Sequence, residues 1–428
     1  MYNVQIETMA IDELRALQNA RLSSLVQRVY ASVPFYKRQF DAIGLRPEDI
    51  RTVEDLPKLP FTRKSDLRDH YPYGMFARPM ADIRRIHASS GTTGKPTVVG
   101  YTQNDLDLFD EVVARSLACA GARPGMKLHN AYGYGLFTGG LGMHGGATKL
   151  GMAVIPVSGG MTDRQLMILQ DFAPEVMCCT PSYAQTLAEA FAQRGIDTGE
   201  LAVKYAILGA EPWTEAIRAQ VESGLQVTAT NIYGLSEIIG PGVSQEDFEE
   251  QGTGSYIWED HFFPEVVDKN TGKPLPHGEE GVLVFTTLTK EAFPLLRYWT
   301  NDICSLHYDP AGKRTHIKMS SIKGRADDML IIRGVNLFPT QVEEIIHELA
   351  FLSPNYRILV AREGTLDTVS VEVETQPDAD PNSAALAQQL RHLLKDRLGL
   401  SMQVSLKAPG SIPRSVGGKL SRVLDQRG

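Results

Sequence analysis

The alternation of helical patterns with short apolar runs between residues 104 and 230 constrains the fold more than any other feature. One apolar helical stripe is formed by Leu106, Phe109, Val112 and Leu117. Further helices are expected at 181–193 and 213–221, and strands at 152–156, 176–179, 205–208 and 226–230. Helices that alternate with short apolar strands are typical of a mostly parallel sheet covered on both faces.

The pattern changes after residue 254. Strands at 265–268 and 281–286, with the turn residues Asn270, Thr271 and Gly272 between them, predict an antiparallel part. The last hundred residues predict a small α+β set. Its helices are expected at 340–350 and 383–398, and its strands at 356–361, 368–374 and 403–406.

The beginning of the chain predicts one long helix followed by irregular structure. A helical stripe at 11–32 contains Leu14, Leu17, Leu22, Leu25, Val26 and Val29, whereas 33–80 is rich in proline. The fold class is therefore α/β, with a large N-terminal domain of mostly parallel sheets covered by helices plus an antiparallel β part. A small α+β C-terminal domain follows, and a charged, glycine-containing segment at 324–328 marks the boundary.

The charge balance excludes some partners. Lys and Arg number 43 against 51 Asp and Glu, a net charge of −8, whereas a nucleic-acid or anionic membrane surface needs a cationic excess. The four cysteines form no C-x-x-C pair and are expected as buried thiols. No stretch approaches the ~18 apolar residues of a membrane span. We expect a soluble protein of a reducing compartment, most simply the cytoplasm.

The densest cluster of chemical groups lies at 89–97, with the sequence SSGTTGKPT. The backbone N–H groups freed by glycine, together with hydroxyl donors, suit a polyphosphate. The same composition also occurs in a flexible hairpin turn. The spacing differs from the Walker A pattern, which disfavours a P-loop kinase or ATPase.

A second glycine-rich region spans residues 132–146. Gly140, Gly142 and Gly145 formally match G-x-G-x-x-G, but no strand ends directly before them and no acidic residue closes a second strand. Aromatic residues among the glycines at 132–140 would wall a narrow pocket for a flat apolar ligand. Close packing of glycines between a helix and a strand is the alternative.

Three later segments carry isolated polar groups. Glu237 follows an apolar strand in the sequence YGLSE, where its carboxylate could hold Mg²⁺. Asp302 ends the sequence RYWTND and could accept two sugar hydroxyls, and a further charged segment spans 324–339. Each segment alone is more typical of a structural turn or a solvated charge.

Together and in this order, these segments and the tail at 413–422, PRSVGGKLSR, resemble the acyl-adenylate-forming superfamily. This superfamily contains acyl-CoA synthetases, peptide-synthetase adenylation domains and luciferases. The resemblance extends from about Ser89 to the C-terminus. The short length and the segments 33–36 and 59–64 are most similar to the bacterial phenylacetate–CoA ligase group. Ser236 departs from the usual threonine of the superfamily but keeps the hydroxyl.

The resemblance implies a two-step reaction, in which ATP adenylates a carboxylate and the thiol of CoA then displaces AMP. It implies that Lys419 and Glu237 are catalytic and that Glu237 holds Mg²⁺. It also implies an ATP site made by Ser90, Gly91, Thr92, Thr93, Gly94, Lys95, Ala210, Glu211, Pro212, Tyr233, Ser236, Asp302 and Arg325. The aromatic acid would contact Tyr132, Tyr134, Phe137, Ile232 and Pro241.

The resemblance further implies a mobile C-terminal domain. The N-terminal domain would span 1–325 and the C-terminal domain 328–428, with the hinge at Asp327. Gly334, Val335 and Asn336 would bind CoA after a rotation that removes Lys419. A homodimer is expected.

Several functions remain open. The acid is phenylacetate by resemblance, but benzoate, aminobenzoate, hydroxyphenylacetate or indoleacetate would fit the same reaction. An adenylation enzyme that loads a carrier protein is another reading. A non-catalytic adenylate-binding relative is disfavoured because a binder needs no Lys419.

Overall fold

A computed structural model describes residues 1–89, 96–326, 330–332, 335–363, 366–415 and 422–426. The chain divides into two compact units. The first contains 1–179, 200–210 and 227–321, and the second contains 180–199, 211–226 and 322–428. The second unit thus combines the C-terminal part with two segments from the middle of the chain.

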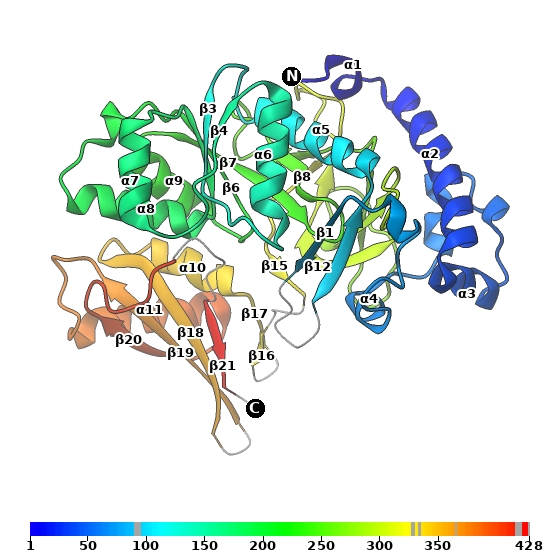
Figure 1. Cartoon of the computed structure of the whole chain (residues 1–428). Helices are drawn as coiled ribbons and strands as arrows, with labels where there is room; N and C mark the ends of the chain where they lie inside the picture. The colour runs from blue at the N-terminus through cyan, green and yellow to red at the C-terminus, as the bar shows by residue number, and fades with distance from the viewer. Residues whose placement is uncertain (90–95, 327–329, 333–334, 364–365, 416–421, 427–428) are drawn as a thin grey trace. The chain divides into compact units, whose positions relative to one another are not determined.

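The first unit is built on a mixed sheet (Figure 1). In spatial order its strands are β13 (Leu306–His307), β14 (Lys318–Met319), β9 (Ser255–Ile257), β8 (Gly240–Glu246), β7 (Thr228–Leu235), β6 (Tyr205–Gly209), β5 (Val176–Cys179), β3 (Lys127–Asn130) and β4 (Ala153–Ile155). From β4 to β7 the neighbours are parallel, as predicted. From β7 to β13 they are antiparallel, so the predicted parallel sheet is half of a larger mixed one.

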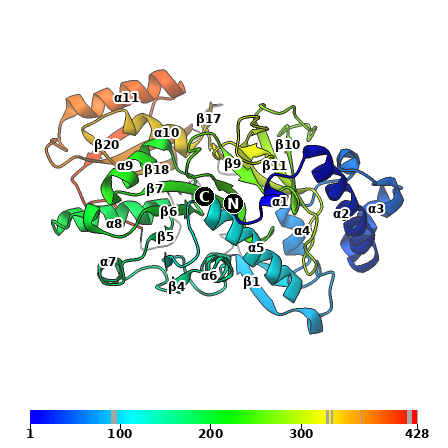
Figure 2. The same ribbon diagram turned by 90° about the horizontal axis from the view of Figure 1, so that it is seen from above.

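Helices α5 (Gln103–Cys119) and α6 (Thr138–Leu150) lie side by side in the first unit (Figures 1 and 2). Glycines on α6 allow this close approach: a Cβ added to Gly142 would lie 2.3 Å from the ring of Phe109, and one added to Gly146 would lie 2.3 Å from Val113. Gly142 and Gly146 therefore serve the packing of α6 against α5, a helix–helix contact rather than the expected packing of glycines between a helix and a strand.

The N-terminal region is more regular than predicted. The long helix α2 (Ile11–Ser32) is confirmed, and 33–80 also contains helices α3 (Pro34–Ala42) and α4 (Lys64–Asp69). The expectation of irregular structure was wrong there because Pro34 occupies the first turn of α3, where its missing N–H group costs no hydrogen bond. The remaining short elements of this region are α1 (Val4–Glu7), η1 (Pro47–Asp49), η2 (Val53–Lys58) and η3 (Met80–Asp82).

Two antiparallel assemblies complete the first unit. The strand β1 (Arg85–Ser89) pairs antiparallel with β2 (Thr97–Tyr101), with Ser89 opposite Thr97. The predicted antiparallel part is confirmed as β10 (Phe262–Val267), β11 (Gly281–Thr287) and β12 (Tyr298–Cys304). Helix α7 (Thr162–Asp171) and the short η4 (Thr198–Glu200) were not predicted.

The second unit has its own apolar core. Its sheet has the order β20 (Gln403–Lys407), β19 (Leu366–Thr375), β18 (Leu352–Glu363) and β21 (Val423–Asp425). Helices α10 (Pro339–His347) and α11 (Ala384–Leu398) supply core residues such as Val342 and Leu390. The predicted α+β pattern of the last hundred residues is confirmed. Shorter strands are β15 (Gly324–Arg325), β16 (Leu330–Ile332) and β17 (Val335–Leu337).

Helices α8 (Pro181–Gln193) and α9 (Glu215–Leu225) belong to the second unit. The Nη1 and Nη2 atoms of Arg414 donate to the carboxylate of Glu374 at 2.8 Å each, and its Nε donates to Glu189 on α8 at 2.9 Å. The Thr214 hydroxyl before α9 donates to Glu343 on α10 at 3.3 Å. These polar contacts connect the two helices to the C-terminal part.

The cysteines Cys119, Cys178, Cys179 and Cys304 are all free and buried, as predicted. Burial raises the pKa of the thiols of Cys119, Cys178 and Cys304 above the ordinary range. Within the described residues, no helix is both long enough and apolar enough to cross a membrane.

Candidate active site

Glu237 lies in the buried turn between β7 and β8 of the first unit, with an exposed fraction of 4%. The hydroxyl of Tyr298 donates to its Oε1 at 3.4 Å, and the ammonium of Lys64 lies 3.7 Å from the same oxygen. The preceding residue, Ser236, shares a hydrogen bond of 3.1 Å with Thr138 at the start of α6. The predicted metal ligand thus stands on a turn that several elements hold in place.

Lys290 lies beneath this turn and is fully buried. Its Nζ donates to the backbone carbonyl of Glu237 at 3.2 Å. The ammonium lies over the rings of Tyr101 and Phe293, at 4.9 and 5.3 Å from their centroids. Burial lowers the pKa of Lys290 to about 8, against the opposing charges of Asp105 and Glu237.

Tyr233 and Asp302 come together although 69 residues separate them. The Tyr233 hydroxyl on β7 donates to Asp302 Oδ2 on β12 at 2.6 Å, and the Tyr233 ring stacks on Phe285 with centroids 6.3 Å apart. Asn301, next to Asp302, has a φ of +69°, a left-handed conformation that costs energy without glycine. The predicted ribose-binding carboxylate is therefore held in a defined orientation.

The predicted adenine segment follows β6. Ala210 has a φ of +72°, another left-handed residue that is not glycine. In the second unit, Glu211 accepts hydrogen bonds from the backbone N–H of Ser182 at 3.2 Å and from its hydroxyl at 2.9 Å. Pro212 follows Glu211, and Arg325 lies on β15 with a half-buried side chain.

The five residues predicted to contact the aromatic acid come from two places in the first unit. Tyr132, Tyr134 and Phe137 lie between β3 and α6, whereas Ile232 is on β7 and Pro241 on β8. The strands β7 and β8 pair directly. A Cβ added to Gly240, just before Pro241, would lie 3.0 Å from the Cβ of Thr138, which follows Phe137. The two groups of segments therefore meet where α6 begins.

Tyr134 is the polar member of this group. Its hydroxyl accepts from Asn130 Nδ2 at 2.8 Å and lies 3.2 Å from His144 Nδ1. Burial raises the pKa of Tyr134 to about 12, so the phenol is neutral at ordinary pH. Phe137 is more exposed, with 37% of its surface accessible.

Several predicted residues lie outside the described residues. They are Ser90, Gly91, Thr92, Thr93, Gly94, Lys95, Asp327, Gly334 and Lys419. The backbones of Val335 and Asn336 lie in β17, opposite Ile332 and Ile331 of β16. The strands β1 and β2, which precede and follow residues 90–95 in the sequence, pair with Ser89 opposite Thr97.

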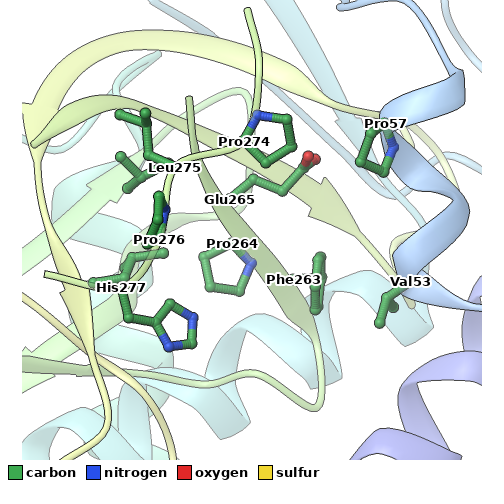
Figure 3. Close-up of a pocket in the computed structure, with 11 residues that line it drawn as sticks. Val53, Pro57, Phe263, Pro264, Glu265, Pro274, Leu275, Pro276 and His277 are labelled. Atoms are coloured by element: carbon green, nitrogen blue, oxygen red, sulfur yellow. The ribbon is translucent and has the colours of Figure 1, made fainter. Parts of the chain in front are cut away.

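A surface pocket of about 190 Å³ in the first unit contains none of the predicted site residues. Figure 3 shows the proline rings of Pro57, Pro264, Pro274 and Pro276 around it, with the imidazole of His277. The acidic lining residue Glu265 forms an ion pair with Arg297, which donates to both of its carboxylate oxygens at 2.9 and 3.0 Å. This pocket belongs to the proline-rich surface of the antiparallel part.

The donor groups fit one magnesium ion bound mainly through a nucleotide. In the part of the chain that the structure describes, no group of three or more His, Cys, Asp or Glu side chains could hold a metal ion. Mg²⁺ keeps several waters and takes one or two carboxylates plus substrate phosphates, so a single buried carboxylate such as Glu237 suffices.

Two family descriptions match the sequence. Residues 38–288 match the AMP-binding enzyme family, and residues 334–427 match the AMP-binding enzyme C-terminal domain. The chain belongs to the AMP-binding enzyme family. The predicted membership in the adenylate-forming superfamily is thereby confirmed.

Known relatives place the chain more closely. It is 61% identical to a phenylacetate–coenzyme A ligase of Thermus thermophilus, with 100% of both chains covered. It is 51% identical to the phenylacetate–coenzyme A ligase of Escherichia coli, with 99% of this chain and 97% of the relative covered. A solved 2-hydroxyisobutyryl-CoA ligase in complex with an acyl-AMP shares 27% identity over 99% of this chain and 92% of that chain, with a TM-score of 0.91. The chain therefore falls in the phenylacetate–CoA ligase group. The predicted α/β fold class is also confirmed.

Sequence reasoning missed some residues beside Glu237. Lys64 occurs in a segment that carried the resemblance, but nothing in the sequence placed it near Glu237. Lys290 stands between Thr289 and Glu291 and looks like part of a solvated turn. Only the folded chain shows that this Lys is buried.

Proposed function

We propose that this family member converts phenylacetate, ATP and CoA to phenylacetyl-CoA, AMP and pyrophosphate through an enzyme-bound phenylacetyl-AMP. The similarity to phenylacetate–coenzyme A ligases over the full length of the chain carries the proposal. The buried Glu237 and the Tyr233–Asp302 hydrogen bond support it, because they supply the carboxylates that the reaction requires.

In the first step, a carboxylate oxygen of phenylacetate attacks the α-phosphorus of ATP. The bond from this phosphorus to the bridging oxygen breaks, and pyrophosphate leaves with the electron pair. Two anions approach each other, so the site must stabilise negative charge on the phosphorus. Lys419 would bridge the carboxylate and the α-phosphate oxygens. Glu237 would hold a magnesium ion, which would supply further charge neutralisation.

The remaining residues would position the nucleotide and the acid. Asp302 would accept the ribose hydroxyls with help from Arg325, and Tyr233 would lie near the adenine. Residues 90–95 would hold the β- and γ-phosphates, with Ser236 beside Glu237, and Ala210, Glu211 and Pro212 would pass along the adenine. The aromatic acid would contact Tyr132, Tyr134, Phe137, Ile232 and Pro241.

In the second step, the sulfur of CoA attacks the acyl carbon and its thiol proton passes to solvent. The bond from the acyl carbon to the phosphate oxygen breaks, and AMP leaves with the electron pair. We propose domains at 1–325 and 328–428, with a rotation at Asp327 that removes Lys419 and presents Gly334, Val335 and Asn336 to CoA. One Lys on the tail would then serve the first step alone.

A panel of aromatic acids tests the substrate. AMP release with ATP, Mg²⁺ and CoA should be fastest for phenylacetate, and an equal response to all acids would contradict the aryl proposal. Omitting CoA tests the acceptor. Release of AMP from the bound adenylate only with a carrier protein would favour a carrier-loading enzyme instead.

The half-reactions test the residues. Lys419→Ala should abolish ATP–pyrophosphate exchange but largely spare thioester formation from supplied phenylacetyl-AMP, and an equal loss of both steps would contradict this division. Asp327→Pro should impair one half-reaction more than the other, and wild-type rates in both would remove the hinge.

We also propose a homodimer and a cytoplasmic location. The location is supported by the free thiols of the chain, because a reducing compartment keeps cysteines unpaired. Light scattering of the purified enzyme would test the dimer, and cell fractionation would test the location.

A further inference from the structure

Lys290 is a buried cation that the proposed reaction does not use. Its side chain has no exposed surface, so it contacts neither solvent nor a substrate directly. Burying an ammonium group costs free energy that an apolar side chain of similar size would not. Its hydrogen bond at 3.2 Å to the carbonyl of Glu237 gives this charge a specific target.

Tyr101 supports the same turn from a second side. Its ring is fully buried and stacks on Phe109, and its hydroxyl donates to the carbonyl of Ile239 at 2.7 Å. The ring also lies under the ammonium of Lys290, 4.9 Å from its centroid. Lys290 and Tyr101 thus donate hydrogen bonds to the backbone carbonyls of Glu237 and Ile239, on either side of the buried Ile238.

The backbone beside Lys290 is itself fixed. Asp105, in the first turn of α5, accepts from the N–H of Glu291 at 2.6 Å and from the N–H of Ala292 at 2.8 Å. A capping box closes the same carboxylate onto Thr102, which directly follows Tyr101. The segment that carries Lys290 and the end of β2 are therefore anchored at one point, the start of α5.

We propose that Lys290 and Tyr101 are positioning residues that orient the Glu237 carboxylate toward the magnesium–nucleotide complex. They act through the main chain of the turn, since neither side chain reaches the site surface. Tyr101 is the last residue of β2, so the same pair connects the turn that carries Glu237 to this strand. This inference rests on the proposed role of Glu237.

Equilibrium binding of ATP, measured by isothermal titration calorimetry with magnesium or with a chelator, tests the proposal without turnover. For the wild-type enzyme, magnesium should tighten ATP binding. In Lys290→Met this gain should fall about tenfold, as expected for the loss of a hydrogen bond from a charged donor. ATP binding in the chelator should change less than twofold. Tyr101→Phe, which removes only the hydroxyl, should give a smaller loss in the same direction.

Three further variants separate the outcomes. Lys318→Met removes another fully buried Lys, one that pairs with Glu250 and Asp309, and should leave the magnesium gain unchanged. In the double variant, Lys290→Met with Tyr101→Phe, the loss of the magnesium-dependent gain in ATP affinity should be smaller than the sum of the two single losses. Both side chains bind the backbone of the same turn, so their effects overlap.

Glu237→Gln should remove the magnesium gain. If that variant keeps the gain, the proposed metal role of Glu237 is wrong and the positioning role falls with it. If Glu237→Gln loses the gain while Lys290→Met and Tyr101→Phe both keep it, the positioning inference alone is overturned. Should Lys290→Met fail to fold, Tyr101→Phe decides between these results.

Discussion

Acid should destabilise the folded enzyme through His129. This residue is buried on β3, and its Nε2–H donates to Gln165 Oε1 at 2.5 Å. Gln165 is fixed in turn, because its amide donates to the carbonyls of Ser158 and Gly160. The Nδ1 atom of His129 is buried and has no hydrogen-bond partner among the residues that the structure describes. A second proton on the ring would therefore create a buried cation whose added N–H group has no acceptor.

The size of the effect follows from the pKa. Burial lowers the pKa of His129 to about 4, and the hydrogen bond to Gln165 opposes this only in part. In the unfolded chain the pKa of histidine is about 6.5. Between these values the unfolded state binds the proton and the folded state does not, so lowering the pH favours unfolding. The cost is absent well above pH 6.5, about 2 kcal/mol at pH 5, and about 3 kcal/mol below pH 4.

Equilibrium urea unfolding at about pH 7.5 and about pH 5 measures this cost. His129→Gln keeps an N–H donor near the Nε2 position but has no group that titrates. The variant should lose about 2 kcal/mol less stability than the wild type between the two pH values. The exposed His392, replaced in His392→Gln, is the matched control and should leave the difference unchanged. An identical pH dependence for His129→Gln and the wild type would refute the reasoning.

Other substitutions should change stability or nucleotide binding. Arg115→Met should cost about 3 kcal/mol in urea unfolding, because it removes donors at 2.8 and 3.1 Å from the buried Asp260 carboxylate; a loss below about 1 kcal/mol would contradict this. Tyr233→Phe should raise the KM for ATP about tenfold through loss of the bond to Asp302, with the KM for phenylacetate unchanged; equal changes in both constants would argue against a nucleotide role. Gly44→Ala should lower the free energy of unfolding by about 1 kcal/mol, since φ is +69° and open space surrounds the new methyl group; an unchanged urea midpoint would exclude this backbone cost.

Periodicity predicted most elements that bury a single apolar face. The helix expected at 181–193 coincides with α8, and the antiparallel pair at 265–286 is present as β10 and β11. The helix α6 was not predicted because its packing surface is made of glycines, which carry no hydrophobic signal. Their role depends on the side chains of α5, so it becomes visible only when both helices are placed.

The functional site likewise contains residues that the sequence predicted and residues that it did not. The order of the motifs predicted that Glu237, Tyr233 and Asp302 act together, and the structure brings Tyr233 and Asp302 into contact. The support beneath Glu237 could not be predicted. Lys290 is buried only because β2, α5 and the turn after β7 meet there, and no local pattern around residue 290 reports such a long-range encounter.

The buried thiols have a practical consequence for the study of motion. Because every natural cysteine is buried, a maleimide dye should not react with the native enzyme. A single cysteine placed at an exposed position, as in Ser401→Cys, would then be the reactive thiol and would need no background substitutions. The fluorescence of a dye at that position offers a direct record of how the C-terminal part responds as ATP, acid and CoA are added in turn.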